Sequence, residues 1–219
     1  MSFSSQKTVK CPCGEEFDAV LWDSVNADRT PELRESLLAG MLNVVACPRC
    51  GQYVYAEKFL LYHEPHSELL AFVYPSASLA EKEKWEKQTV TDFQKSQDAS
   101  PEEEKIKYPP VIFFGLDTLV SLLSKEQEEQ DQGEIAASLA VSAGIKIARL
   151  SPSLARRSGV PAILPYVSHE RKSPSQQILE GLHRIVKAND RLSVYLQWKD
   201  DLPKSPALTI AFLDSLKLP

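Results

Sequence analysis

The chain has 219 residues, of which 43% are hydrophobic and 25% are charged, a composition ordinary for a soluble globular protein of one or two domains. No run of 18 apolar residues occurs, which argues against a membrane-spanning helix, and the segment Met1–Ser5 lacks the apolar region of a secretory signal. We therefore expect a cytoplasmic protein without a membrane partner. In that compartment, paired cysteines more often bind metal or perform redox chemistry than form structural disulfides.

The formal net charge of −5 is unevenly distributed along the chain. Residues 136–219 contain 12 lysines and arginines against 6 aspartates and glutamates, whereas residues 76–135 contain 7 against 14. The basic C-terminal part is therefore the better candidate for contact with an anionic partner. That partner could also be an acidic part of the same chain or of a second copy.

The four cysteines of the chain form two closely spaced pairs, in Cys11–Gly14 and in Cys47–Gly51. Four thiolates complete the tetrahedral shell of one structural zinc ion. In the second pair, Gly51 can adopt the positive φ that a tight turn often needs. In the first pair, positions i and i+2 of an extended segment point to the same side, so both sulfurs can face one ion. The pattern predicts a structural Zn²⁺ site, with these ligands: Cys11, Cys13, Cys47 and Cys50.

The sequence around the cysteine pairs predicts mainly β-strands. Alternating apolar positions predict a strand over residues 15–25. Thr30 and Pro31 indicate the N-cap and first turn of a short helix that ends at Gly40. Further strands are expected at residues 42–46, 53–55, 59–62 and 69–74, with a turn at residues 63–67. The elements predict a zinc-ribbon-like antiparallel β domain with an inserted helix.

The middle of the chain is strongly charged. Residues 79–98 predict an exposed helix or a linker, and residues 99–104 resemble a second helix start. Residues 111–115 predict a short buried strand. A helix begins at Leu116 and runs into the polar stretch 125–132. We place a domain boundary there, giving domains 1–132 and 133–219.

The second domain is expected to be mainly helical, so the predicted fold class is α+β. Residues 135–150 are rich in alanine and predict a helix, whereas residues 151–174 predict an irregular, proline-containing loop. Ser173 and Pro174 begin a clearly amphipathic helix. Residues 192–198 alternate like a strand, and a last helix follows Ser205 and Pro206.

Several segments besides the cysteines resemble the CpXC family. They are Ser24–Asn26, Pro31–Arg34, Leu42-Asn43, Cys47–Gly51, Tyr62-His63 and Val111–Leu119. The resemblance covers roughly residues 8–127. It implies a presumed zinc-binding domain without an established activity, so it supports the metal and leaves the function open. The first pair departs from a C-P-x-C pattern, because one residue rather than two separates Cys11 from Cys13.

Two other residue patterns could carry chemistry. A thiol redox role for Cys47 and Cys50 is one alternative, although a strand-like run follows the pair where thioredoxin-like motifs have a helix. His63 and His66 are spaced either for a second metal site or for a replacement ligand at the cysteine site, or else they belong to a polar hairpin turn.

The basic segment 149–172 suggests a nucleic-acid-associated regulator, although it has few aromatic residues for base stacking. Its cationic side chains are Arg149, Arg156, Arg157, Arg171 and Lys172. No constellation of base, nucleophile and oxyanion donors is visible, so we expect no enzymatic activity. The favoured interpretation is a non-catalytic zinc-binding protein that acts as a protein-interaction or scaffold module. Its partner would be an unknown protein or a second copy of the chain.

Overall fold

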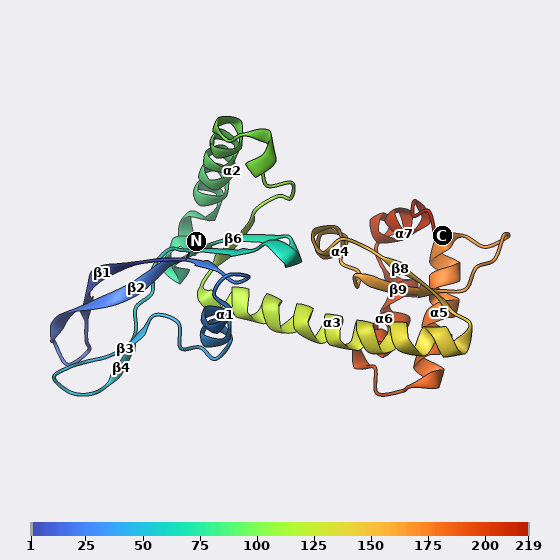
Figure 1. Cartoon of the computed structure of the whole chain (residues 1–219), viewed down its shortest axis with the longest axis horizontal. Coiled ribbons are helices and arrows are strands. Elements are labelled where there is room, and N and C mark those ends of the chain that lie inside the picture. Colours follow the sequence, from blue (N-terminus) through green and yellow to red (C-terminus); the bar gives the residue numbers. More distant parts are fainter. Residues whose placement is uncertain (1, 219) are drawn as a thin grey trace. The chain divides into compact units, whose positions relative to one another are not determined.

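The computed structural model describes residues 2–218 and has the mixed α+β architecture that the sequence predicts. The chain divides into two compact units, Met1–Ser124 and Lys125–Pro219. The longest helix, α3 (Leu116–Ala143), begins in the first unit and ends in the second (Figure 1). In the described part of the chain, no helix is long and apolar enough to cross a membrane.

The first unit is built on a five-stranded mixed sheet with the order β1-β2-β5-β6-β7. Neighbours β1/β2 and β5/β6 are antiparallel, but β2/β5 and β6/β7 are parallel. The expectation of a purely antiparallel domain is therefore wrong for this sheet. Parallel pairs require crossover connections, and the segments that contain α1 (Pro31–Leu38) and α2 (Lys82–Ala99) provide them. The strands are β1 (Phe3–Lys10), β2 (Glu16–Asn26), β5 (Leu60–Glu64), β6 (Leu69–Tyr74) and β7 (Val111–Phe114).

Helices cover both faces of this sheet. Leu60 and Tyr62 belong to a core that also contains residues of α1 (Pro31–Leu38) and the first turns of α3. On the opposite face, Tyr74 packs against Trp85 of α2 (Lys82–Ala99), with ring centroids 4.9 Å apart. Figure 1 shows α1 and α2 on opposite sides of the strands. The buried core comprises Val25, Ala27, Leu37, Leu42, Leu60, Tyr62, Leu69, Ala71, Val73, Leu119 and Leu123.

Two local expectations in this unit need correction. Thr30 occupies the N-cap position of α1, but its hydroxyl donates to the Asn26 carbonyl oxygen at 2.8 Å and does not cap the first turn. Residues 99–104 do not begin a second α-helix, since only the short 3₁₀ turn Glu102–Glu104 forms there. Residues 79–98, expected as a helix or a linker, are mostly helical, in α2. Two more 3₁₀ turns are Pro65–Ser67 and Ser76–Glu81.

The second unit combines helices with a two-stranded antiparallel sheet of β8 and β9. Its core is formed by apolar side chains of α3, β8, β9, α5, α6 and α7, including Leu164, Leu182 and Tyr195. The helical character expected for this region is present. The elements are β8 (Lys146–Arg149), α4 (Pro152–Ser158), β9 (Ile163–Tyr166), α5 (Pro174–Ala188), α6 (Ser193–Asp201), the 3₁₀ turn Leu202–Lys204, and α7 (Ala207–Asp214).

Three segments of the second unit differ from the sequence prediction. Residues 146–149 leave the helix and pair with β9, and the expected loop 151–174 contains both α4 and β9. Residues 192–198 belong largely to α6 and do not form a strand. From residue 192 to residue 202, buried side chains recur every three or four positions, the period of a helix that buries one face. These buried side chains are Leu192, Tyr195, Trp198 and Leu202.

Candidate metal centre

Cys11 and Cys13 lie in the turn that joins β1 to β2. The Gly14 backbone N–H donates to the Cys11 carbonyl oxygen at 2.9 Å, and Gly14 has a φ of 89°. Cys11 and Cys13 therefore lie in a turn and not in the extended segment that the sequence suggested, although both sulfurs face one cluster. A glycine-terminated turn positions both sulfurs, because it reverses the chain within a few residues.

The second cysteine pair occupies an equivalent place between β3 (Val44–Ala46) and β4 (Tyr53–Tyr55). The Gly51 N–H donates to the Cys47 carbonyl oxygen, and the Cys47 N–H donates to the Gln52 carbonyl oxygen, both at 2.9 Å. Gly51 has a φ of 72°, as the C-x-x-C-G spacing suggests. Figure 1 shows the β3–β4 hairpin beside the far end of the β1–β2 ribbon.

The two turns bring all four sulfur atoms together. The Sγ atoms of Cys11 and Cys50 are 3.6 Å apart, those of Cys13 and Cys47 are 3.8 Å apart, and all four lie within 4.8 Å of one another. A zinc ion with four Zn–S bonds of about 2.3 Å has its sulfur atoms about 3.8 Å apart. A disulfide requires about 2.05 Å, and the four cysteines are free thiols. The spacing thus fits one tetrahedral metal ion.

The electrostatics of the cluster also favour a cation. Burial disfavours the Cys47 thiolate, but the backbone N–H groups of Cys50 and Arg49 and the thiols of Cys11 and Cys50 lower the pKa of Cys47 to about 7. The backbone N–H of Cys13 favours the Cys11 thiolate, but burial and the three other thiols raise the pKa of Cys11 to about 12. Without a metal, the Cys47 thiolate is favoured and the Cys11 thiolate is disfavoured. A dication would allow all four to ionise together.

Nearby cations offset only part of that charge. Lys10 lies 3.4 Å from Glu16 and Arg49 lies 3.7 Å from Glu15, so both flanking cations are paired with carboxylates. Cys11 and Cys47 are each 2% exposed, whereas Cys13 and Cys50 are exposed. Each turn therefore contributes one buried and one exposed cysteine to the cluster.

The two histidines do not join a common site. Nε2 of His63 lies 2.7 Å from the Tyr108 hydroxyl. His66 contacts two carboxylates, with Nδ1 2.5 Å from Asp28 and Nε2 3.4 Å from Glu64. Within residues 2–218, the four cysteines are the single group of three or more histidine, cysteine or carboxylate side chains with the spacing of a metal site. Only His66 lies in the expected turn, Pro65–Ser67, whereas His63 belongs to strand β5 (Leu60–Glu64), so the polar-turn interpretation is wrong for His63.

The basic segment is largely neutralised by side chains of its own unit. Arg149 forms a two-point pair with Glu134, at 2.8 and 3.2 Å, and Arg156 forms another with Glu126, at 2.6 and 2.9 Å. The pairing with Glu134 raises the pKa of Arg149. Two further cations also have partners: Lys172 contacts Glu180, and Arg157 contacts the Ser153 carbonyl oxygen.

Sequence reasoning missed a buried charged network beside the first core. The Glu64 carboxylate is 2% exposed, accepts a hydrogen bond from the Tyr62 hydroxyl at 2.6 Å, and lies 3.1 Å from Nε of Arg34. Nothing in the sequence marks Glu64 as buried, because an isolated glutamate at a strand end is usually solvated. Its partner Arg34 lies 30 residues away.

Comparison with known families agrees with the cysteine geometry. A family model described as CpXC protein matches residues 9–136, which is more than half of the chain. The chain belongs to the CpXC family. Neither a curated protein nor a solved structure matches it.

Proposed function

We propose that the chain is a non-catalytic, zinc-binding module in which Cys11, Cys13, Cys47 and Cys50 hold one structural Zn²⁺. The observation that carries the proposal is the convergence of four sulfur atoms within 4.8 Å from two separate turns. Thiolates are the preferred ligands of structural zinc, and four of them leave no open position for a substrate or a reactive water. Two metal-binding turns at hairpin ends also support a zinc-ribbon-like arrangement.

The module's role is to bind another protein, or a second copy of itself, in the cytoplasm. Exposed apolar side chains support this part of the proposal. Tyr53 of the β3–β4 hairpin is 70% exposed, and in the second unit Val141 and Leu208 are 86% and 84% exposed. Aromatic side chains such as Tyr53 are enriched at the centres of protein interfaces, and exposed aliphatic side chains such as Val141 and Leu208 gain free energy when a partner removes them from water.

Metal content tests the first part of the proposal. Elemental analysis of the full chain, purified without added metal, is expected to find one zinc per chain. Thiol titration is expected to find all four cysteines protected until a chelator is added. Ser142→Cys, at an exposed position of α3, provides the control because its added thiol should react at once. A metal-free protein with two rapidly reacting thiols would instead favour redox chemistry at Cys47 and Cys50.

Self-association tests the second part without requiring a second protein. Light scattering of the full chain is expected to give a mass that rises with concentration. Leu208→Lys should lower that mass by placing a charge on the exposed apolar surface. Lys204→Ala, at an exposed position nearby in the chain, serves as the control. A strictly monomeric wild type would contradict self-association.

A further inference from the structure

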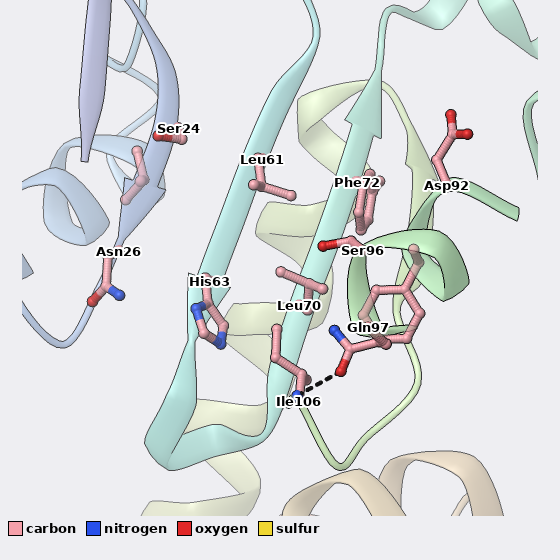
Figure 2. Close-up of a pocket in the computed structure, with 12 residues that line it drawn as sticks. Ser24, Asn26, Leu61, His63, Leu70, Phe72, Asp92, Ser96, Gln97 and Ile106 are labelled. Atoms are coloured by element: carbon pink, nitrogen blue, oxygen red, sulfur yellow. Dashed lines mark hydrogen bonds between the residues drawn. The ribbon is translucent and has the colours of Figure 1, made fainter. Parts of the chain in front are cut away.

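A pocket of about 390 Å³ lies in the first unit, between the sheet and α2. Its walls come from β2, β5 and β6 on the sheet side, and from α2 and the segment after it on the other (Figure 2). Pockets of 300–1,000 Å³ are the usual size for small-molecule sites. The pocket shares no residue with the cysteine cluster.

The floor of the pocket is apolar. Leu61 of β5 and Phe72 of β6 are cross-strand partners, and Figure 2 shows both side chains on the sheet side of the pocket. Flat aromatic rings and aliphatic side chains favour an apolar ligand with a planar face. The apolar residues that line the pocket are Val25, Leu61, Leu70, Phe72, Phe93 and Ile106.

Two side-chain amides present hydrogen-bond donors to this apolar space. Oδ1 of Asn26 accepts from the Arg29 backbone N–H at 3.1 Å, and Oε1 of Gln97 accepts from the Ile106 backbone N–H at 2.8 Å. These backbone donors fix the orientation of both amides and leave the NH₂ groups for a ligand. Figure 2 shows Asn26 on the β2 side and Gln97 on the α2 side.

His63 lies between these amides. Its Nε2 contacts the Tyr108 hydroxyl at 2.7 Å, so Nδ1 is the ring nitrogen left for a ligand. Burial lowers the pKa of His63, and the ring is therefore neutral at pH 7. A neutral imidazole adds a further hydrogen-bonding atom without adding charge.

The lining contains one carboxylate and neither lysine nor arginine. That carboxylate, Asp92, accepts a hydrogen bond from Gln88 at 2.7 Å and lies 3.8 Å from Lys95, so its charge is partly offset. Phosphate and carboxylate ligands would find no cation here, and a strongly cationic ligand would find little uncompensated negative charge. The charge pattern favours a neutral ligand.

We propose that this pocket binds a neutral, planar heteroaromatic molecule whose carbonyl or ring-nitrogen atoms accept hydrogen bonds from Asn26 and Gln97. The ring system would lie against the apolar floor formed by the sheet. This role is separate from the metal centre and from the protein-binding role, and it would make the first unit a small-molecule binding domain.

Nile red tests the proposal, because it is an uncharged planar dye with carbonyl and ring-nitrogen acceptors and its fluorescence rises in apolar sites. The full chain is expected to bind one dye molecule with micromolar affinity. Ser96→Trp, which fills the pocket from α2, should abolish binding. Val90→Trp, on the same helix at a position that is 57% exposed and outside the pocket, should not. Absence of binding by the wild type, or equal binding by Ser96→Trp, would overturn the proposal.

Matched acid variants test the two amides. Asn26→Asp and Gln97→Glu keep the oxygen that accepts from the backbone N–H and replace the NH₂ donor with an acceptor. Each should weaken Nile red binding by about three- to tenfold. Gln6→Glu, an exposed position of β1, provides the charge control, and unchanged thermal unfolding would show that the fold is retained. Equal affinity of all three variants and the wild type would refute the role of the amides.

Discussion

Nε of Arg34, on α1, lies 3.1 Å from Oε1 of Glu64, at the end of β5, and the Glu64 carboxylate is almost completely excluded from solvent. Removing the cation would leave a buried carboxylate with less compensation. We expect Arg34→Met to lower the free energy of unfolding by about 3 kcal/mol, measured by urea denaturation. Arg29→Met, at an exposed position nearby, should change it by less than about 0.5 kcal/mol. Similar losses for both variants would contradict this account.

Metal removal should loosen one part of the first unit before the rest. Strands β3 and β4 contain no fully buried side chain, whereas β5 and β6 are largely buried. If the four cysteines hold a metal ion as proposed, this hairpin is expected to depend on that ion for its order. Hydrogen exchange of the full chain with chelator is expected to show faster exchange at residues 44–55 and little change at residues 60–74. Uniform loss of protection across both ranges would show that the metal supports the whole sheet.

The stability of the first unit should include a term from His63 that depends on pH. Burial lowers the pKa of His63 below the usual histidine value of about 6.5, so the unfolded chain binds the proton more readily than the folded one. This contribution to stability is complete above about pH 6.5 and is lost as the pH falls through the lowered pKa. The free energy of unfolding, measured by urea denaturation at several pH values, should therefore fall more steeply between pH 7.5 and pH 5 for the wild type than for His63→Gln. His183→Gln, at an exposed position of α5, should follow the wild type.

Gly181 marks a close approach between α5 and β9. A Cβ at this position would lie 2.3 Å from the Pro165 carbonyl oxygen and 2.6 Å from Cα of Tyr166. The obstacle is backbone, which cannot move aside as a flexible side chain can. We expect Gly181→Ala to destabilise the protein by about 1–3 kcal/mol in thermal unfolding. Lys187→Ala, exposed on the same helix, should have a small effect, and an unchanged melting temperature for Gly181→Ala would contradict the observed packing.

Nucleic-acid binding by the basic segment should be weak, because Arg149 and Arg156 are already paired with glutamates. Fluorescence anisotropy with a labelled oligonucleotide is expected to show no saturable binding at physiological salt. Strong binding that falls with salt and is lost in Arg171→Glu, at an exposed position, would reverse this conclusion. Arg156→Glu is a poor test variant, since it would also break the contact with Glu126.

The sequence predicted well those elements whose signals are local. Ser173 and Pro174 begin α5 as expected, and the Ser173 backbone N–H donates to the Gln176 side chain in a capping box. Gly51 adopts the positive φ that its place after Cys50 suggests. Such residues determine their own backbone conformation without help from distant parts of the chain.

The failures lie where distant partners decide the structure. Residues 146–149 form a strand because β9 supplies their hydrogen bonds, and β9 itself is buried beneath α5. The same limit applies to the sites. The spacing of the cysteines was enough to predict their cluster. The pocket beside His63 could not be predicted, because one of its walls is α2, and the charged sequence of residues 79–98 was compatible with either a helix or a linker.

Helix α3 has a practical consequence for preparing fragments of this protein. The family match ends at residue 136, inside this helix, and Ala136 and Ala140 are buried in the core of the second unit. A fragment that ends at residue 136 would expose the face of α3 that normally packs against the core of the second unit. The complementary fragment would lack part of the same core. Expression trials should therefore begin with the intact helix, and a boundary drawn from family similarity alone would predispose the truncated products to aggregation.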